Sequence, residues 1–388
     1  MTDNSDVTFG MTVYGISKYI NDTHIFSFWE YVMNKYVKRY LIDALGGMAQ
    51  GLFASLLTGT IVKTLGQQLL LLGSNPVFKF LVDAGNFASD PHVVGAAMAV
   101  GIGFAMQVPP LVLFTLAAVG SAANVCGGAG GPLAVLFIAI LAAEAGCLVS
   151  KKTKVDIIVT PMVTILSGAL LTVLTAKYIG QAASAFGNVI VWATTLRPFL
   201  MGMIISLLVG VLLTLPVSSA AICAALGLTG LAGGAAVAGC CAQMVGFAVL
   251  SFRENRWSGL LSQGLGTSML QMPNIVKNPK IWLPACLTSL ITGPVATCIF
   301  KMEMNGAAVS SGMGTCGLVG QIGVVSGWFN PSQPALLHGA SAINPGVFDW
   351  LGLILVCFVL PGILTWLFGL LFRKAGWIKE GDLLLENS

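Results

Sequence analysis

The apolar run Trp282-Leu-Pro-Ala-Cys-Leu-Thr-Ser-Leu-Ile-Thr-Gly-Pro-Val-Ala-Thr-Cys-Ile-Phe300 leads, past Glu303, into the tract Asn305-Gly-Ala-Ala-Val-Ser-Ser-Gly-Met-Gly-Thr-Cys-Gly-Leu-Val-Gly-Gln321. Glycine-rich, non-helical backbone survives at membrane depth only where protein buries it or where it lines a cavity. Ionisable groups at that depth are costly and usually face a cavity or a substrate path. The stretch therefore predicts a polar site inside a membrane protein, with the Glu303 carboxylate at its mouth.

The composition of the chain supports this environment. Of the 388 residues, 56% are hydrophobic and only 9% are charged, against about 25% charged residues in soluble domains. Lipid must therefore be the main solvent of the surface. The formal net charge of +4 comes from scattered basic residues, whereas nucleic-acid binding needs a concentrated basic face. We expect a multi-pass membrane protein without a nucleic-acid partner.

Metal, cofactor and catalytic motifs are not recognisable in the sequence. The nine cysteines lie in apolar or Gly/Ala-rich stretches without a CxxC pair, and the three histidines are far apart, so we expect neither a zinc site nor a disulfide framework. There is also no phosphate-binding loop spacing, nucleophile elbow or HExxH sequence. We expect no cofactor, no metal, no catalytic residue and no autonomous enzymatic activity.

Hydropathy predicts an all-α, polytopic membrane fold with nine candidate spans. A crossing needs about 20 apolar residues. The candidate spans are 41–62, 64–82, 93–121, 132–150, 155–177, 197–217, 230–251, 280–300 and 350–372. We expect 93–121 to be one long helix bent at Pro109-Pro110. Segment 26–40 is typical of an amphipathic interfacial helix, and 178–195 and 258–276 are polar enough to lie along the interface.

Two apolar tracts are too broken to span simply, 216–234 and 305–328. Interrupted segments of this kind are typical of re-entrant hairpins at a transport site, although ordinary small-residue helix packing gives the same composition. Both tracts follow a change of character near residue 195. We therefore predict four regions: an N-terminal cytoplasmic or interfacial segment 1–40, a scaffold or dimerisation half 41–195, a substrate-binding half 196–375, and a tail 376–388.

The strongest candidate for a substrate contact is Glu303, because a carboxylate can accept hydrogen bonds from two hydroxyls of a sugar or polyol. The alternative is that Lys301 merely neutralises it at a helix end. His338 lies between two Asn-Pro turns and can both donate to and accept from a hydroxyl, or it is a loop residue in water. Amides suit neutral hydroxylated ligands, although an interhelical hydrogen bond explains each equally well. The candidate amides of this kind are Asn305, Gln321 and Asn344. Gln271 and Asn274 are further candidates, either bordering a permeation path or lying in an interfacial helix and turn.

The second half of the chain resembles a known family. A broken tract and an apolar span come first, followed by the segment Gln263-Gly-Leu-Gly-Thr-Ser-Met-Leu-Gln-Met-Pro-Asn-Ile-Val-Lys-Asn-Pro279. A second apolar span comes next, and then Met302-Glu-Met-Asn-Gly-Ala307 leads into a glycine-rich tract. This order resembles the IIC-type membrane subunits of bacterial phosphotransferase systems, and more narrowly the IIC-like perfringolysin O regulators. The resemblance covers roughly residues 35–375.

The resemblance implies a homodimer in a bacterial inner or plasma membrane, with about ten spans per protomer. It implies that the first half dimerises and that the second half holds the sugar between two re-entrant hairpins, one with a glutamate at the position of Glu303. A histidine also contacts the sugar in such proteins, but His338 lies later in the chain. Where such proteins carry the sequence Thr-Glu-Pro or Asn-Glu-Pro around this glutamate, the present chain has Met302-Glu303-Met304. IIA and IIB partners would be separate subunits.

Three functional hypotheses follow. The first is a IIC-like transporter that carries a small hydroxylated solute, a sugar or a related compound, through the bilayer by alternating access. The second is a membrane sensor or regulator that binds such a ligand without coupled phosphorylation. The third is a proton-coupled transporter with Glu303 as the carrier group.

Overall fold

The computed structural model describes residues 36–385, and within them the protein is helical apart from one isolated β-bridge between Gly230 and Met304. The predicted all-α class is confirmed. Residues 1–35, which include most of the predicted interfacial helix, and the last three residues of the tail lie outside the described part. The α-helices are α3 (Ala44–Leu52), α4 (Thr58–Leu72), α5 (Pro76–Ala88), α6 (Pro91–Ala105), α7 (Pro110–Gly127), α8 (Gly131–Val149), α9 (Asp156–Leu171), α10 (Lys177–Thr194), α11 (Pro198–Thr214), α12 (Ser219–Ala225), α13 (Gly230–Leu250), α14 (Phe252–Leu261), α15 (Met272–Lys277), α16 (Leu283–Pro294), α17 (Val319–Phe329), α18 (Gln333–Leu337), α19 (Val347–Ile354) and α20 (Leu360–Lys374).

Short 3₁₀-helical and π-helical turns join several of these α-helices into longer helical rods. The π-helical turns are η1 (Lys38–Asp43), η2 (Phe53–Leu57), η4 (Thr172–Ala176), η5 (Ser262–Gly266), η8 (Val295–Ile299) and η11 (Leu355–Val359). The 3₁₀ turns are η3 (Gly128–Gly130), η6 (Ser268–Gln271), η7 (Pro279–Trp282), η9 (Ala308–Gly312) and η10 (Cys316–Leu318).

Six helical segments of the described chain are long and apolar enough to cross a membrane, as expected for a polytopic membrane protein. They are Lys38–Leu70, Pro110–Val149, Asp156–Thr194, Gly230–Leu250, Pro279–Ile299 and Val347–Lys374. Three shorter apolar helices accompany them, Pro91–Ala105, Pro198–Thr214 and Cys316–Phe329. The number of crossings and the two re-entrant hairpins stay predictions.

The predicted span 64–82 is wrong, because the chain turns in the middle of it. Helix α4 ends at Leu72, and α5 starts at Pro76 with the Asn75 side chain accepting a hydrogen bond from the Val77 N–H, 2.9 Å away. Asparagine at the cap and proline at the first helical position both favour a new helix start. Helix α5 then folds back onto α4, since Gly85 packs directly against the backbone of Gly59 and Lys63.

The predicted single bent helix over 93–121 is also wrong. Helices α6 and α7 are separate and pack side by side, with the backbones of Gly95 and Gly120 in direct contact. The chain reverses between them at Gln107, which has a left-handed φ of 55°. Proline disfavours helical backbone in the preceding residue, so Pro109-Pro110 ends one helix and starts another instead of bending one.

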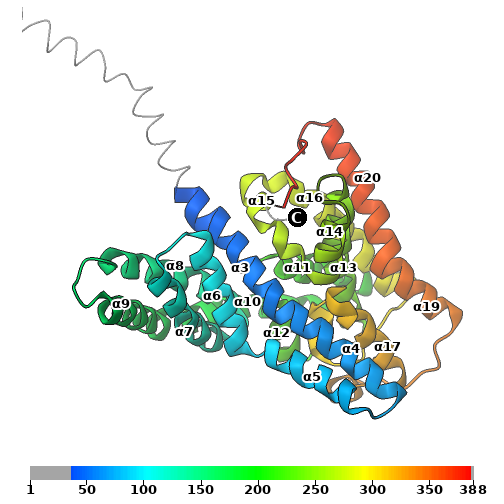
Figure 1. The fold of residues 1–388 in the computed structure, drawn as a ribbon. Coiled ribbons are helices and arrows are strands. Elements are labelled where there is room, and N and C mark those ends of the chain that lie inside the picture. Colours follow the sequence, from blue (N-terminus) through cyan, green and yellow to red (C-terminus); the bar gives the residue numbers. More distant parts are fainter. Residues whose placement is uncertain (1–35, 386–388) are drawn as a thin grey trace, which may run out of the picture.

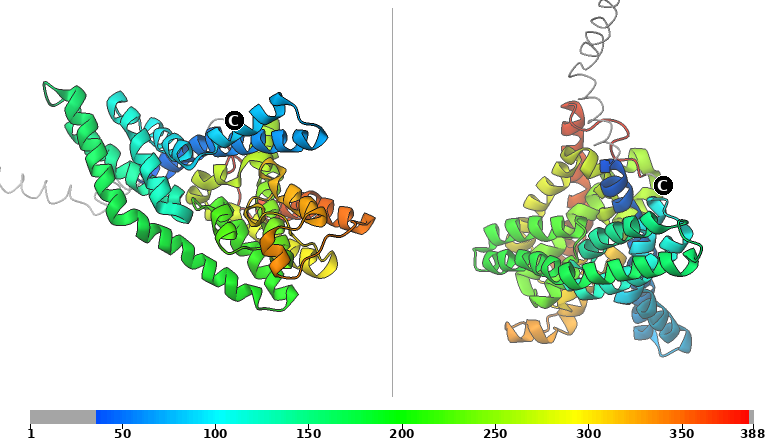
Figure 2. Two further views of the ribbon diagram at one scale, coloured as in Figure 1. Left: turned by 90° about the horizontal axis from the view of Figure 1, so that it is seen from below. Right: turned by 90° about the vertical axis from the view of Figure 1, so that its left-hand side faces the viewer.

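Two long rods organise the molecule. Figure 1 shows the rod of α3 and α4 crossing in front, with α6 to α9 on one side of it, α11, α13, α16 and α20 on the other, and α12 behind it. Figure 2 shows the 39-residue rod of α9 and α10 running along a whole side of the molecule. The segment 178–195, predicted to lie along the interface, is thus the continuous second part of a helix that begins at Asp156.

The packing relies on small residues where helices approach closely. A side chain at Gly239 on α13 would overlap the backbone of Ser206 on α11, and one at Gly293 on α16 would overlap that of Gly202 on α11. Such contacts are typical of helix association in membranes, where lipid offers no hydrophobic drive between helices. Helices α11, α13 and α16 therefore form a tight core in the second half of the chain.

One large buried cluster joins residues from both sides of the predicted boundary at residue 195. It contains Met48 and Met98 from the first half, together with Phe247, Met269 and Ile281 from the second. The division into a scaffold half and a substrate half stays a prediction, and the two parts share this apolar core.

Candidate functional site

The segment that carries Glu303 is extended and is fixed by backbone pairing. Lys301 has a left-handed φ of 47°, which turns the chain after the rod that ends at Ile299. Met304 then pairs with Gly230, the first residue of α13, through two backbone hydrogen bonds of 3.0 and 3.1 Å. A Cβ at Gly234 would overlap the Met302 carbonyl, so this glycine allows the strand-like segment to lie against the helix.

Alternation along this extended segment sets the direction of the Glu303 side chain. Successive side chains of an extended chain point to opposite sides. Met302 and Met304 are buried in an apolar cluster with Val237 and Trp328. Glu303 therefore points away from the core and is exposed. Its carboxylate lies at the edge of a cavity.

Asn305 orients the carboxylate. Its Nδ2 donates to Glu303 Oε2 at 2.8 Å, and its Oδ1 accepts from the Gly230 N–H at 3.2 Å. Asn305 is 7% exposed, so the amide is held between the N-terminus of α13 and the acid. The N-terminus of a helix favours acceptors and negative charge. Among the described residues, no protein group forms a hydrogen bond with the other carboxylate oxygen, Oε1.

A cavity of about 340 Å³ adjoins this acid. It carries two carboxylates and one ammonium group, from Glu303, Asp349 and Lys301, beside the aromatic ring of Trp328. Its lining consists of Phe300, Lys301, Met302, Glu303, Asn305, Gly327, Trp328, Gly339, Ala340, Ser341, Ile343 and Asp349. The size falls in the range of small-molecule sites, and the mixture of polar groups suits a hydroxylated ligand.

The structure brings some of the predicted site residues to this cavity and not others. Glu303 and Asn305 line it together. The loop between α18 and α19 supplies Gly339 to Ile343, whereas His338 and Asn344, at the two ends of that stretch, are exposed and do not line it. Gln321, on α17, is buried elsewhere, where its Nε2 donates to Cys241 Sγ at 3.2 Å.

Asp349 and Lys301 are lining residues that the sequence analysis did not select. Asp349 lies in the first turn of α19, where its Oδ2 accepts from the Gly346 N–H at 2.7 Å. An acidic residue in the first turn, just before a long apolar run, is the sequence signal that could have identified it. Lys301 was considered only as a neutralising partner of Glu303, and no ion pair between them is recorded among the described residues.

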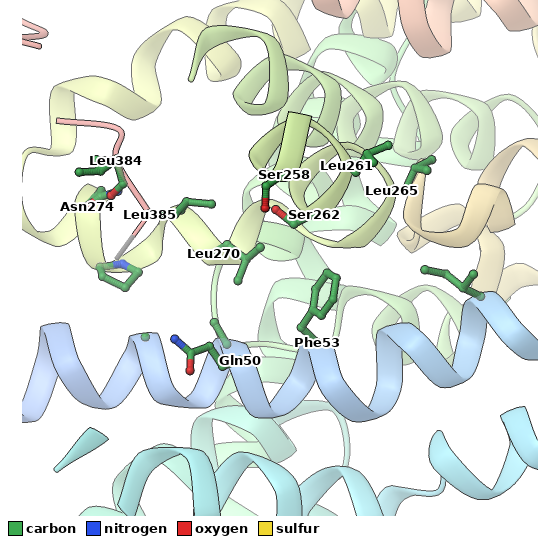
Figure 3. A pocket seen from close by; sticks show the side chains of 14 residues that line it. Gln50, Phe53, Ser258, Leu261, Ser262, Leu265, Leu270, Asn274, Leu384 and Leu385 are labelled. Atoms are coloured by element: carbon green, nitrogen blue, oxygen red, sulfur yellow. The ribbon is translucent and has the colours of Figure 1, made fainter. Parts of the chain in front are cut away.

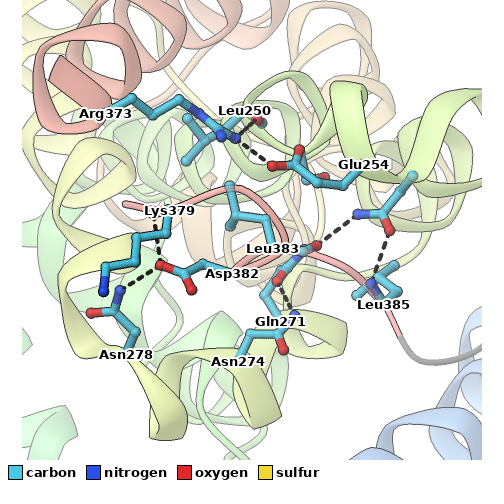
Figure 4. Close-up of polar contacts among 12 residues, drawn as sticks. Leu250, Glu254, Gln271, Asn274, Asn278, Arg373, Lys379, Asp382, Leu383 and Leu385 are labelled. Atoms are coloured by element: carbon cyan, nitrogen blue, oxygen red, sulfur yellow. Dashed lines mark hydrogen bonds and ion pairs between the residues drawn. The ribbon is translucent and has the colours of Figure 1, made fainter. Parts of the chain in front are cut away.

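Gln271 and Asn274 belong to a different place, an amide cluster that holds the tail of the chain (Figure 4). Gln271 Nε2 donates to the Leu383 carbonyl at 3.0 Å, and Asn274 Nδ2 donates to the Leu384 carbonyl at 2.9 Å. We define the amide cluster as Asn255, Gln263, Gln271, Asn274 and Asn278.

Two further members of the amide cluster also bind the tail. Asn255 Nδ2 donates to the Leu383 carbonyl at 2.8 Å and its Oδ1 accepts from the Leu385 N–H at 2.9 Å. Asn278 Nδ2 donates to Asp382 Oδ2 at 2.8 Å. The Leu383 side chain is fully buried. The side-chain amides predicted to border a permeation path are therefore bonded to the protein's own main chain.

Comparison with protein families agrees with the helical, membrane-type architecture. The model of the family described as Phosphotransferase system, EIIC matches residues 42–385, which is most of the chain. The chain belongs to the phosphotransferase-system EIIC family. No curated protein and no solved structure matches this EIIC protein.

Membership confirms the resemblance seen in the sequence and the assignment to a multi-pass membrane protein. The EIIC family implies sugar transport in general, with a sugar as substrate and IIA and IIB subunits as partners. In this EIIC protein the cavity beside Glu303 has a mixed polar and apolar lining, whereas the amide cluster is occupied by the tail.

Proposed function

We propose that this EIIC protein transports a small hydroxylated solute, a sugar or a related compound, and holds it in the cavity beside Glu303. The observation that carries this proposal is the contact between Asn305 Nδ2 and Glu303 Oε2 at 2.8 Å. It fixes one carboxylate oxygen and leaves the other without a hydrogen bond to the described part of the protein. A carboxylate held in this way can accept hydrogen bonds from neighbouring hydroxyls of a sugar.

The other lining groups support a neutral polyol. Ser341 can donate or accept, and the Lys301 ammonium can donate to a ring or hydroxyl oxygen. Trp328 offers an apolar face, and its ring lies edge-on to that of Trp350 with centroids 4.9 Å apart. Apolar walls with a few placed polar groups are the usual composition of small-molecule sites.

The two broken tracts interlock behind this site, which supports their movement as one unit. Ser219 Oγ donates to the Gly312 carbonyl at 2.8 Å, and Ser311 Oγ donates to the Leu228 carbonyl at 2.7 Å. In our proposal the tracts are the re-entrant hairpins of the substrate half. That half moves as a rigid body in a homodimer within a bacterial cell membrane, and separate IIA and IIB subunits supply any phosphate.

Binding and uptake with acid and amide variants test this function. The reconstituted protein is titrated with a panel of neutral monosaccharides and polyols, and uptake of the ligand that binds is then measured in proteoliposomes. We expect Glu303→Gln and Asn305→Ala each to weaken binding by about tenfold or more, because the first removes the charged acceptor and the second removes the donor that orients it. Glu380→Gln is the control, since Glu380 is exposed in the tail and lies outside the cavity.

Three results would overturn or change parts of the proposal. Unchanged binding in both site variants would show that the ligand does not bind in the Glu303 cavity. Binding without uptake, with or without IIA and IIB subunits, would assign sensing instead of transport. Uptake that responds to a pH gradient and loses this response in Glu303→Gln would assign proton coupling.

A further inference from the structure

A second cavity, of about 610 Å³, lies away from Glu303 between the rod that starts at Lys38, the α14–η5 segment and the tail (Figure 3). Its walls come from three parts of the chain that are distant in sequence. The lining residues are Gly46, Ala49, Gln50, Phe53, Ile61, Ser258, Leu261, Ser262, Leu265, Leu270, Pro273, Asn274, Leu384 and Leu385. In Figure 3 the Phe53 ring points from the rod toward the segment that carries Ser258 and Ser262.

The lining of this second cavity is apolar and carries no charged residue. Its polar groups are few, and some are already used. Asn274 Nδ2 donates to Gln271 Oε1 and to the Leu384 carbonyl, both at 2.9 Å. A sugar would leave most of its hydroxyls unpaired here, which is costly. Apolar cavities of this kind do not hold water well and take up apolar ligands instead.

The cavity opens on an apolar surface. Three of its lining side chains are also exposed, Leu261 at 55%, Leu265 at 37% and Ile61 at 36%. Leu65, one turn beyond Ile61 on the same rod, is 53% exposed. In a protein whose rods cross a membrane, exposed leucine and isoleucine side chains face hydrocarbon. The neighbourhood of the opening is therefore lipid.

We propose that this cavity binds the acyl chain of a membrane lipid. Because lipid tails are as apolar as the lining, the hydrophobic effect adds little. What an occupant gains is dispersion contact, since an empty void leaves its lining atoms without partners. The tail that walls the cavity continues into a polar edge, where Lys280 Nζ lies 5.5 Å from the centre of the Trp377 ring. Tryptophan and lysine are typical of the headgroup level, so the chain enters with its headgroup toward this edge.

Photolabelling of the unmodified protein tests the proposal. The protein is reconstituted in vesicles of phosphatidylcholine and phosphatidylglycerol with a trace of phosphatidylcholine that carries a diazirine in its acyl chain. After irradiation, adducts are mapped by mass spectrometry. We expect adducts on Phe53 and Leu270, which are only partly exposed and line the cavity. Adducts confined to fully lipid-facing residues such as Leu65 would overturn the proposal.

A filled cavity and a matched control sharpen the result. Leu265→Trp puts an indole into the cavity, and we expect it to lower labelling of Phe53 by about fivefold or more because the volume is taken. Leu65→Trp makes the same change on the exposed surface outside the cavity and should leave Phe53 labelling unchanged. Equal labelling in both variants would overturn the proposal. A second outcome would also overturn the proposal: the wild-type cavity is not labelled, and Leu265→Trp dissociates a dimer. A second copy of the chain would then cover the opening.

Discussion

Gln271 on η6 bonds to the main chain of Leu383, with its Nε2 3.0 Å from the Leu383 carbonyl oxygen. The same amide nitrogen donates to Gln263 Oε1 at 3.0 Å, and Gln271 Oε1 accepts from Asn274. Gln271 is fully buried. A single side chain therefore connects the tail to two other members of the amide cluster.

Removing this connection should destabilise the protein. We expect Gln271→Ala to cost about 1–3 kcal/mol, because it leaves buried amide groups without partners. The measurement is thermal unfolding in detergent. Gln181→Ala is the matched control, since Gln181 on α10 is exposed, and its effect should lie within about 0.5 kcal/mol. Equal midpoints for the two variants would mean that the tail contributes nothing through Gln271.

The hydrogen bond between Asn305 and Glu303 should tolerate an exchange of donor and acceptor. Asn305→Asp places two carboxylates where the structure has a 2.8 Å bond, and like charges at that distance disfavour ionisation of both. We expect a loss of about 1–3 kcal/mol of stability, from the lost bond and the repulsion. The double variant Glu303→Gln with Asn305→Asp restores a donor facing an acceptor and should recover most of it. Additive losses in this double-mutant cycle would show that the two side chains are not coupled.

The close approach of α11 and α13 should make Gly239 intolerant of even a methyl group. A Cβ there would overlap the Ser206 backbone, so we expect Gly239→Ala to destabilise by at least about 1–3 kcal/mol. Gly362→Ala on α20 is the control, because its nearest neighbour would be Val249 Cγ2 at 3.6 Å. In a helix interior with room for it, alanine should stabilise by up to about 1 kcal/mol. Chemical denaturation of both variants measures the difference, and a reversed order would contradict the packing described.

Two ion pairs of nearly the same length should differ in strength. Arg373 and Glu254 are 2.7 Å apart with side chains 18% and 5% exposed, whereas Arg39 and Glu144 are 2.8 Å apart with side chains 38% and 35% exposed. Breaking a buried pair leaves an uncompensated charge, so we expect Arg373→Ala to cost about 3 kcal/mol or more. Arg39→Ala should cost about 1 kcal/mol or less. Unfolding midpoints in low and high salt check this, and a larger loss for Arg39→Ala would contradict it.

The membrane class and the acid of the site could be predicted because both depend on local sequence. Low charge content sets the solvent, and Glu303 stands out as a carboxylate at the end of an apolar run. Asn305, two residues away on an extended segment, lies on the same side as Glu303 by alternation alone. The helix ends at Leu72 and Ala105 also had local signals, an Asn-Pro and a Pro-Pro pair, but the apolar residues around them suggested continuous spans.

The roles of Gln271 and Asn274 could not be predicted, and the physical reason is clear. Their partners are main-chain carbonyls of Leu383 and Leu384, more than a hundred residues away. A carbonyl group has no sequence signature, so nothing in the tail marks it as the acceptor. The role of Gln321 could not be predicted for a similar reason, because its partner, Cys241, looks in the sequence like any other buried apolar residue of α13.

The rod of α9 and α10 sets a geometric condition on how the protein sits in its bilayer. Its 39 residues extend about 58 Å at 1.5 Å per residue, nearly twice the roughly 30 Å of hydrocarbon. Lys177, exposed and about one hydrocarbon thickness along the rod from Asp156, is where we expect the helix to reach water. Because the helix does not break there, α10 continues rigidly from the embedded part and packs along the molecule, with Gly180 against Gly130 of η3 and Gly187 beside Leu226 at the end of α12. Any tilt of the embedded part would be magnified at its far end, near Arg197, where the first residues of α11 begin.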